Sequence, residues 1–360
     1  MPLRMNLYVH FPFCVSKCAY CALHSRAGST PAERAAYVAR IAHEITARIN
    51  FGRERFRTVY FGGGTPALCD LRPVFAALAG SLAEGCEFTV ELHPRNASPE
   101  TLAALAAGGV NRISMGVQAL DDAVLSSMGR CHAAAEAEAA FRAIRAAGFA
   151  NAGIDLIAGW PWGQTPSSWG QTLERALALE PDHVSVYSLI REKGTPLDRA
   201  IDAGGIPEPS DESALAAVRQ ADATLSSAGF RRYEISNWAR PGRVCRHNCA
   251  VWRGEDYVGI GEGAHGRLGL VRTVDGAVAE TLGPEGDALE RAVFALRTAE
   301  GLSLRRTARL WPVLAGRMAA WRGELEFGVE QGLLIRRGED VYVLTPRGAE
   351  VCDSVIAGLV

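Results

Sequence analysis

The sequence lacks several features that would each indicate a class of protein. No apolar run approaches the roughly 20 residues that a membrane-spanning helix needs. The 38 Lys and Arg nearly balance the 40 Asp and Glu, which excludes binding to nucleic acid or membranes mainly through bulk charge. The start, from Met1 to His10, has one Arg followed by a strand-like run, unlike a signal peptide. We therefore expect a cytoplasmic protein with no nucleic-acid partner and at most peripheral membrane contact.

The size and the cysteines set further bounds. A chain of 360 residues with 48% hydrophobic residues predicts one large domain and one smaller one. The nine cysteines are an odd number, and three of them lie within eight residues. A disulfide framework is not expected in a cytoplasmic protein of this size. A metal or redox role for the three crowded cysteines is the better interpretation.

Strand-like and helical patterns alternate through the first two-thirds of the chain. Six such units predict parallel strands joined by right-handed crossovers, in an open doubly wound sheet or an incomplete (β/α) barrel. Function is then expected at the carboxyl ends of the strands. The expected strands are Leu7–His10, Thr58–Phe61, Glu87–Leu92, Arg112–Met115, Ala152–Ile157 and Val184–Leu189. The expected helices are Ala32–Arg48, Asp70–Leu82, Ser98–Ala107, Ala133–Ala147, Ser167–Leu179 and Ser210–Ser227.

The composition changes after about residue 230. Tyr233–Gly269 is rich in Gly, Arg, Trp and His and shows no clear elements, and such long segments are more often functional than idle. From Glu285 the pattern is helical again and ends in a hairpin, as in a winged helix. We expect three parts: 1–230 as the barrel, 231–284 as a connecting segment, and 285–360 as a helical, winged-helix-like domain.

Cys14, Cys18 and Cys21 form a C-x3-C-x2-C motif after the first strand. Three thiolates on one loop can hold one face of a 4Fe–4S cluster, whereas four are needed to close a cluster or a zinc site. The motif therefore predicts a cluster with one open iron. Zinc completed by Cys245 or Cys249, or a chance spacing, are the alternatives. The remaining cysteines are expected to be small core residues: Cys69, Cys86, Cys131 and Cys352.

The neighbourhood of this motif carries a family resemblance. The run Tyr8–Cys14 (YVHFPFC) and the pair Tyr20-Cys21 resemble the signature of radical S-adenosylmethionine (SAM) enzymes, and more narrowly the oxygen-independent coproporphyrinogen oxidase family. The resemblance implies a partial (β/α)6 barrel, in agreement with the six units. It also implies that SAM chelates the open iron and that an electron from the cluster cleaves SAM to a 5′-deoxyadenosyl radical.

The resemblance extends to residues at the ends of later strands. The run Tyr60–Pro66 (YFGGGTP) looks like the family's SAM-binding loop, and glycines there let the backbone approach a ligand closely. Each later polar residue, taken singly, is more often a solvated loop residue than a ligand, but together they match the family in order and spacing. The implied SAM residues are Tyr8, Tyr20, Gly63, Gly64, Thr65, Glu91, Gln118, Arg130 and Asp155.

Two features place the chain nearer the HemW-type relatives, which are heme chaperones, than the oxidases. Leu23 stands where the oxidases carry a further cysteine, and Tyr8 leaves no room for their N-terminal extension. The chaperone motif H-N-x-x-Y-W is present as His247–Trp252, with valine in place of tyrosine at Val251. Glu262 stands where the family has proline.

This branch implies heme as cargo, bound through His247, Asn248 and Trp252. A lone histidine in a loop is usually a structural hydrogen-bonding group, and Cys245 or Cys249 are rival ligands to heme iron. Tryptophans could line an apolar cleft of porphyrin size, although core packing is equally expected for each. The three concerned are Trp160, Trp162 and Trp238.

Three functions follow. The first is a heme chaperone that binds a 4Fe–4S cluster and SAM, takes electrons from a reducing donor and delivers heme to acceptor proteins. The second is a catalytic radical SAM enzyme acting on a tetrapyrrole. Capacity to cleave SAM is expected, coproporphyrinogen oxidase activity is not, and no catalytic residue is assigned. The third, a winged-helix DNA-binding regulator, is disfavoured because residues 301–360 carry a net charge of only +1.

Overall fold

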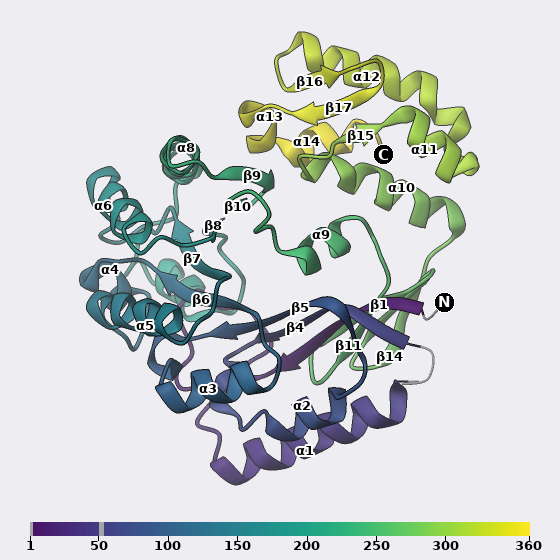
Figure 1. Cartoon of the computed structure of the whole chain (residues 1–360). Helices are drawn as coiled ribbons and strands as arrows, with labels where there is room; N and C mark the ends of the chain where they lie inside the picture. Colours follow the sequence, from purple (N-terminus) through teal and green to yellow (C-terminus); the bar gives the residue numbers. More distant parts are fainter. Residues whose placement is uncertain (1–2, 50–53) are drawn as a thin grey trace.

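The computed structural model describes residues 3–49 and 54–360, so Met1 and Pro2 of the expected start lie outside the described residues. Six consecutive parallel strands form the curved centre of a twelve-stranded sheet, with helices on its outer side (Figure 1). The six strands are β1 (Leu3–Phe11), β4 (Glu54–Gly63), β5 (Leu82–Leu92), β6 (Arg112–Gln118), β7 (Ala152–Ala158) and β8 (His183–Ser188). The expected partial (β/α)6 barrel is confirmed.

Alternation along each strand separates the apolar outer layer from a polar interior. On β1 the side chains of Leu7, Val9 and Phe11 are fully buried, and the Phe11 ring lies 6.2 Å from that of Tyr37 on the first helix. The intervening side chains of Asn6, Tyr8 and His10 face the inside of the barrel and form hydrogen bonds there.

The crossover helices begin where the sequence supplies caps. Thr30 accepts the backbone N–H of Glu33 in a capping box, as expected for the helix that Pro31 begins. The helices of the barrel are α1 (Pro31–Arg48), α2 (Arg72–Leu78), α3 (Pro99–Ala107), α4 (Asp122–Ser127), α5 (Ala134–Ala146), α6 (Pro166–Leu177), α7 (Pro196–Asp202) and α8 (Asp211–Ser227).

One expected helix is too long. The range Asp70–Leu82 was expected to be helical, but α2 ends at Leu78 and Leu82 already begins β5. Gly80 has a φ of +81°, a left-handed conformation that glycine adopts without strain and that ends the helix.

The expectation of no clear elements in Tyr233–Gly269 is wrong. This segment extends the sheet at both edges, because β10 pairs with β8 and β11 pairs in parallel with β1. Strands that precede residue 230 in the sequence and strands that follow it therefore belong to one sheet. The three-part division of the chain stays a prediction. The added elements are β9 (Arg231–Glu234), β10 (Asn237–Ala239), α9 (Arg246–Trp252), β11 (Tyr257–Ile260), β12 (His265–Leu268), β13 (Val271–Val274) and β14 (Ala277–Thr281).

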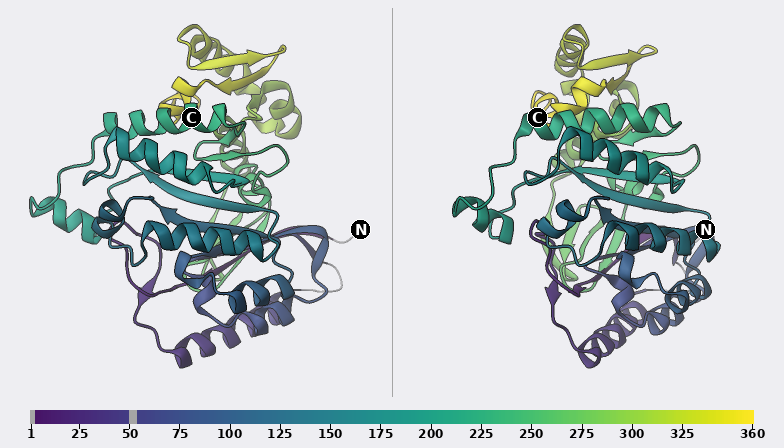
Figure 2. Two further views of the ribbon diagram at one scale, coloured as in Figure 1. Left: turned by 60° about the vertical axis from the view of Figure 1, so that its left-hand side comes forward. Right: turned by 90° about the vertical axis from the view of Figure 1, so that its left-hand side faces the viewer.

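The C-terminal domain has a core of its own and contains the expected hairpin, but the chain does not end there, because two short helices follow it. Trp321, Leu325 and Tyr342 lie in this second core. Figure 2 shows the domain beyond α8, at the end of the molecule opposite α1. Its elements are α10 (Pro284–Phe294), the 3-10 turn η3 (Ala295–Arg297), β15 (Leu302–Ser303), α11 (Leu304–Leu310), α12 (Met318–Glu330), β16 (Leu334–Arg337), β17 (Val341–Leu344), α13 (Pro346–Glu350) and α14 (Cys352–Ala357).

No helix in the described ranges is long and apolar enough to cross a membrane. The cellular compartment stays a prediction.

Candidate functional site

The three motif cysteines share one loop at the carboxyl end of the barrel. Cys14 ends the short strand β2 (Phe13–Cys14), which pairs with β3 (Arg26–Ala27) and so closes the loop that carries Cys18 and Cys21. Lys17 holds this loop from within, since its Nζ donates to Leu23 O at 2.7 Å and to Ser25 Oγ at 2.6 Å. All three thiols are partly exposed and line the same cavity.

The donor set suits a 4Fe–4S cluster, because three thiolates on one loop leave one iron open. Within the described part of the chain, no three His, Cys, Asp or Glu side chains lie close enough to hold one metal ion. Cys245, considered as a fourth zinc ligand, is instead fully buried and directs its Sγ to Glu87 Oε1 at 3.7 Å.

The glycine loop lies against the cysteine loop and leaves no room for side chains. Gly64 N donates to Phe11 O at 2.8 Å, and Thr65 N donates to Phe13 O at 2.7 Å. A Cβ on Gly64 would stand 2.9 Å from Cys14 Sγ, and one on Gly63, with a φ of +110°, would stand 2.6 Å from the His10 ring. Only glycine therefore fits at both positions.

Glu91 at the end of β5 is held by two donors. Tyr60 Oη donates to Glu91 Oε1 at 2.9 Å, and Gly63 N donates to Oε2 at 3.1 Å. Burial and, to a lesser extent, the nearby Asp155 carboxylate together raise the pKa of Glu91 to about 7, against the lowering by Tyr60. A cationic ligand group in the cavity would restore the charged carboxylate.

Gln118 and Arg130 line the same cavity as the glycines. A register shift between Gly116 and Gln118 and a φ of +70° at Gln118 turn the end of β6 at the cavity wall. Arg130 Nη2 donates to Gly116 O, and its Nη1 lies 3.4 Å from Cys18 Sγ. The guanidinium is therefore fixed beside the cysteine loop, where it can pair with a carboxylate.

Asp155 is positioned by serines from the two flanking strands. Ser185 Oγ donates to Oδ1 at 2.6 Å, and Ser114 Oγ lies 3.1 Å from both carboxylate oxygens. Burial raises the pKa of Asp155, and these hydroxyl contacts lower it. A carboxylate so placed can accept from ligand hydroxyls at the cavity wall.

One cavity of about 680 Å³ brings the expected SAM residues together with the cysteines. Its lining includes Cys14, Cys18, Cys21, Tyr20, Gly63, Gly64, Thr65, Glu91, Gln118, Arg130 and Asp155, so Tyr8 alone of that set is absent from it. The sequence missed His93, Tyr187 and Cys131 as lining residues. Cys131, expected in the core, is only partly buried and lies 3.7 Å from His93 Nε2. Its position directly after Arg130 in the sequence was the signal that could have identified it as a lining residue.

Tyr8 does not line the cavity and is connected to the cysteine loop through His10. Because His10 Nε2 donates to the His24 carbonyl at 2.7 Å, His10 Nδ1 must accept from Tyr8 Oη at 2.9 Å. His24 belongs to the cysteine loop, so Tyr8 positions the residue that anchors this loop to β1.

The expected heme residues lie on α9, which begins inside the barrel beside Thr58 of β4 and Glu87 of β5. His247 is 4% exposed, and its Nδ1 is 2.8 Å from Thr58 Oγ1. Thr58 donates its proton to Asn6, so His247 Nδ1 donates to Thr58. Burial lowers the His247 pKa to about 3 and keeps the ring neutral. Asn248 and Trp252 are partly buried, and the Trp252 ring lies 5.7 Å from Phe294. The heme role of these three residues stays a prediction.

Two of the three tryptophans considered for a porphyrin cleft are core residues. Trp160 and Trp238 are at most 1% exposed, and their indole N–H groups donate to Ser127 Oγ and Asp222 Oδ1, each at 2.7 Å. Trp162 is 53% exposed.

Comparison with known proteins agrees with this geometry. The model of the radical SAM superfamily matches residues 8–176. A protein named heme chaperone HemW from Mycobacterium tuberculosis is 33% identical over 98% of this chain and 94% of its own. The chain belongs to the HemW family of radical SAM proteins.

One further relative and one solved structure extend the comparison. Radical S-adenosyl methionine domain-containing protein 1, mitochondrial, from Bos taurus is 36% identical over 87% of this chain and 72% of its own. Coproporphyrinogen III oxidase (HemN) from Escherichia coli superposes with a TM-score of 0.84 at 22% identity, over 99% of this chain and 90% of that one, and shows the shared fold. Membership of the superfamily implies a 4Fe–4S cluster and SAM, and the cysteine loop and glycine cradle fit both.

The chain's departure from the family motif at Glu262 has a structural counterpart. Glu262 Oε2 accepts from Arg26 on β3 at 2.6 Å, and Oε1 accepts from Arg40 on α1 at 2.9 Å. Its backbone N–H donates to Tyr37 Oη at 3.0 Å, a bond that proline could not make.

Proposed function

We propose that the protein is a heme chaperone that holds a 4Fe–4S cluster and SAM in its barrel and delivers heme to acceptor proteins in the cytoplasm. The observation that carries the proposal is identity of 33% to a protein named heme chaperone HemW, over 98% of the chain. A reducing electron donor is part of the proposal, because the cluster supplies an electron to SAM when both are bound.

The residues of the barrel divide the binding work. The thiols of Cys14, Cys18 and Cys21 hold the cluster, and Gly63 and Gly64 let a ligand approach the backbone. The Glu91 carboxylate attracts the methionyl amine of SAM, the Arg130 guanidinium attracts its carboxylate, and Asp155 accepts from its ribose. The buried walls exclude water from these charged contacts, which strengthens them.

Large apolar side chains at the entrance of the SAM cavity support heme binding there. Val15, Leu23 and Ile190 line the cavity and are 57%, 57% and 67% exposed, and Tyr187 is 44% exposed. Exposed apolar side chains gathered at one cavity are typical of a binding surface. The flat apolar face of a porphyrin matches such a surface, and Leu23 adds apolar area where an oxidase would have a thiol.

Heme titration of the reconstituted protein under anaerobic conditions tests the proposal. Wild-type protein should give a saturable Soret band. Leu23→Asp and Ile190→Asp should each weaken heme binding severalfold, whereas Val278→Asp, on the distant strand β14 and 68% exposed, should not. His247→Ala tests the motif histidine separately, and a shifted Soret maximum would assign it as a ligand.

Two outcomes would contradict the proposal. Absence of saturable heme binding in the folded, cluster-loaded protein would remove the chaperone function. Formation of protoporphyrinogen from coproporphyrinogen, SAM and a reductant would restore the catalytic alternative. Transfer of bound heme to an apo-protein acceptor, followed by the acceptor's own absorbance, tests delivery.

A further inference from the structure

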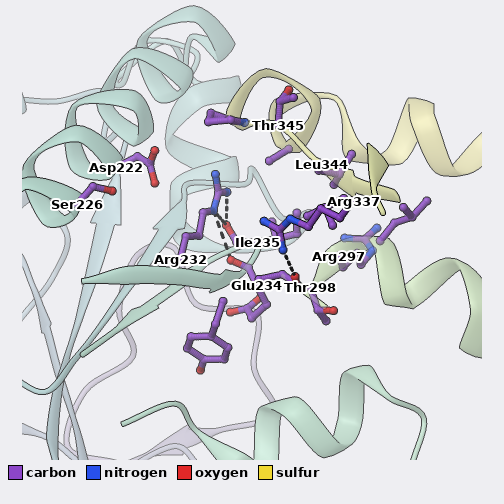
Figure 3. A pocket seen from close by; sticks show the side chains of 16 residues that line it. Asp222, Ser226, Arg232, Glu234, Ile235, Arg297, Thr298, Arg337, Leu344 and Thr345 are labelled. Atoms are coloured by element: carbon purple, nitrogen blue, oxygen red, sulfur yellow. Dashed lines mark hydrogen bonds between the residues drawn. The ribbon is translucent and has the colours of Figure 1, made fainter. Parts of the chain in front are cut away.

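A second cavity, of about 250 Å³, lies between the barrel and the C-terminal domain (Figure 3). The barrel contributes Asp222 and Ser226 from α8 and residues 232–235 at β9. The C-terminal domain contributes residues 296–299, Arg337 and 343–346. No lining residue is shared with the SAM cavity. We propose that this second cavity binds a small oxyanion, a phosphate or a carboxylate, through Arg232, Arg297 and Arg337.

Three guanidinium groups reach the cavity from three separate elements, β9, η3 and β16. Arg232 Nε donates to Ile235 O at 3.1 Å, and Arg337 Nη1 donates to Ala299 O at 3.2 Å, as Figure 3 shows. These acceptors are neutral carbonyl oxygens. Among residues 3–49 and 54–360, neither arginine is within ion-pair distance of a carboxylate. Arg297 pairs with Asp353 through Nη2, but its buried Nε has no protein partner.

The two carboxylates that line the cavity are engaged with barrel groups. Asp222 Oδ1 accepts the indole N–H of Trp238 at 2.7 Å. Glu234 accepts the backbone N–H of Ser236 at 3.2 Å and the side-chain amide of Asn237. Asp353 is a third carboxylate, paired with Arg297, so the three arginines are matched in number by three carboxylates. The guanidinium groups of Arg232 and Arg337 nevertheless donate to carbonyl oxygens and not to a carboxylate, and an anion would supply the charged acceptor.

The burial of Arg232 makes the binding of an anion energetically favourable. Burial lowers the pKa of Arg232, because removing a guanidinium from water disfavours its charged form. An opposite charge with hydrogen-bonding oxygens offsets that cost, and the planar guanidinium fork pairs well with carboxylate or phosphate oxygens. The Arg232 guanidinium lies 4.8 Å above the Trp238 ring, which fixes its plane.

The size of the cavity restricts the ligand. Pockets for drug-sized ligands start at about 300 Å³, so a cavity of about 250 Å³ suits a small ion and not a porphyrin. An ion held by Arg232 on one side and by Arg297 and Arg337 on the other would link the barrel to the C-terminal domain. Arg219 on α8 and Glu350 on α13 already form one such link, with both N–O distances at 2.6 Å.

Isothermal titration of the full chain with sodium phosphate, and separately with sodium succinate, tests the site at constant ionic strength. We expect saturable 1:1 binding of at least one of them, weakened about tenfold in Arg337→Gln by loss of one charge-assisted bond. Arg337 is exposed, so this variant should fold. Arg232→Lys keeps the charge but loses the fork and should also bind more weakly.

Arg336→Gln is the matched control, because the neighbouring Arg336 pairs with Glu326 at 2.7 Å and does not line the cavity. Its affinity should equal that of the wild type. Saturation by phosphate alone would identify a phosphate site, and saturation by succinate alone a carboxylate site. No saturable binding of either anion, or equal losses in Arg336→Gln and Arg337→Gln, would overturn the proposal.

Discussion

The two ends of the barrel interior are both polar, but their polar groups are used differently. The mouth, which is the cavity lined by the three cysteines, Glu91, Arg130 and Asp155, leaves its charged groups facing open space. The floor is made of Thr58, Glu87, Arg112, His183, Tyr233, Cys245 and His247. Most of these groups hydrogen-bond within the floor, although Arg112 Nε and His183 Nδ1 have no partner among the described residues. At the floor Glu87 accepts the backbone N–H groups of Arg246 and His247, each at 3.0 Å. His183 Nε2 and Tyr233 Oη lie 2.8 Å apart.

This contrast shows that residue type alone does not separate function from structure in this barrel. Glu87 and Glu91 lie on the same face of β5, four residues and therefore about 13 Å apart along the strand. One carboxylate closes the N-terminal end of α9, and the other faces the cavity. Position along the strand decides the role, as in complete barrels, where the carboxyl end carries function and the amino end carries stability.

The largest expected effect concerns the mouth. Replacing Cys14, Cys18 and Cys21 together by alanine should abolish the visible absorbance of the reconstituted cluster, because no other thiol lies on this loop. The far-ultraviolet circular dichroism should remain that of the wild type, since the cysteine loop is also fixed by β2–β3 pairing. Normal iron and sulfide content in the triple variant would contradict the assignment.

Substitutions in the floor should lower the stability of the protein and leave SAM binding unchanged. Glu87→Ala removes the acceptor of two backbone N–H groups and leaves the buried Arg112 without its nearby negative charge. Leaving a buried donor without an acceptor costs about 1–3 kcal/mol, and urea denaturation should show a decrease of that order in the free energy of unfolding. SAM affinity of the folded variant should be unchanged.

Glu91→Gln is the matching change at the mouth, and its effect on stability should have the opposite sign. Burial raises the pKa of Glu91 from 4.5 to about 7, so the free energy of unfolding falls as the pH rises from 4.5 to 7. Glutamine removes this ionisation, and the variant should be more stable than the wild type at pH 8, by about 3 kcal/mol at most. A loss of stability at pH 8 would contradict the pKa direction.

The same carboxyl group should make SAM binding depend on pH. Below pH 7 Glu91 must lose a proton to accept the methionyl amine, so affinity should be about tenfold weaker at pH 6 than at pH 8. Glu91→Gln should bind SAM weakly and without this pH dependence. Calorimetry in two buffers of different ionisation enthalpy should detect the released proton in the wild type alone.

Local signals predicted most of the mouth. The helix begun at Pro31 follows its Thr30 capping box, and the three cysteines and the triple glycine come together because both follow neighbouring parallel strands. Sequence spacing did not reveal which residue of an interior face reaches the cavity. Tyr8 and His10 share an interior face of β1, yet neither lines the cavity, because Tyr8 bonds to His10 and His10 bonds to the carbonyl of His24.

The floor was harder to predict, because its elements are short and paired over long sequence distances. The strand β11 has only four residues, and Val258 pairs with Leu7 at the other end of the chain. No periodicity can appear in so short a strand. The motif histidine His247 therefore looked like a loop residue, although tertiary contacts bury it against Thr58.

The smallest expected effect concerns Glu262, which follows β11 and joins the cysteine loop of the mouth to α1. Its ion pairs with Arg26 and Arg40 involve side chains that are 38–48% exposed, and exposed pairs contribute about 0.2–1 kcal/mol each. Glu262→Gln should therefore lower the free energy of unfolding by about 1 kcal/mol at low salt. At 1 M NaCl the difference should vanish, because salt screens exposed charges.

Glu262→Pro removes in addition the N–H bonded to Tyr37, and Tyr37 also holds His10 O at 2.7 Å. Its destabilisation should persist at high salt, and equal effects of the two variants at 1 M NaCl would show that the backbone bond contributes nothing.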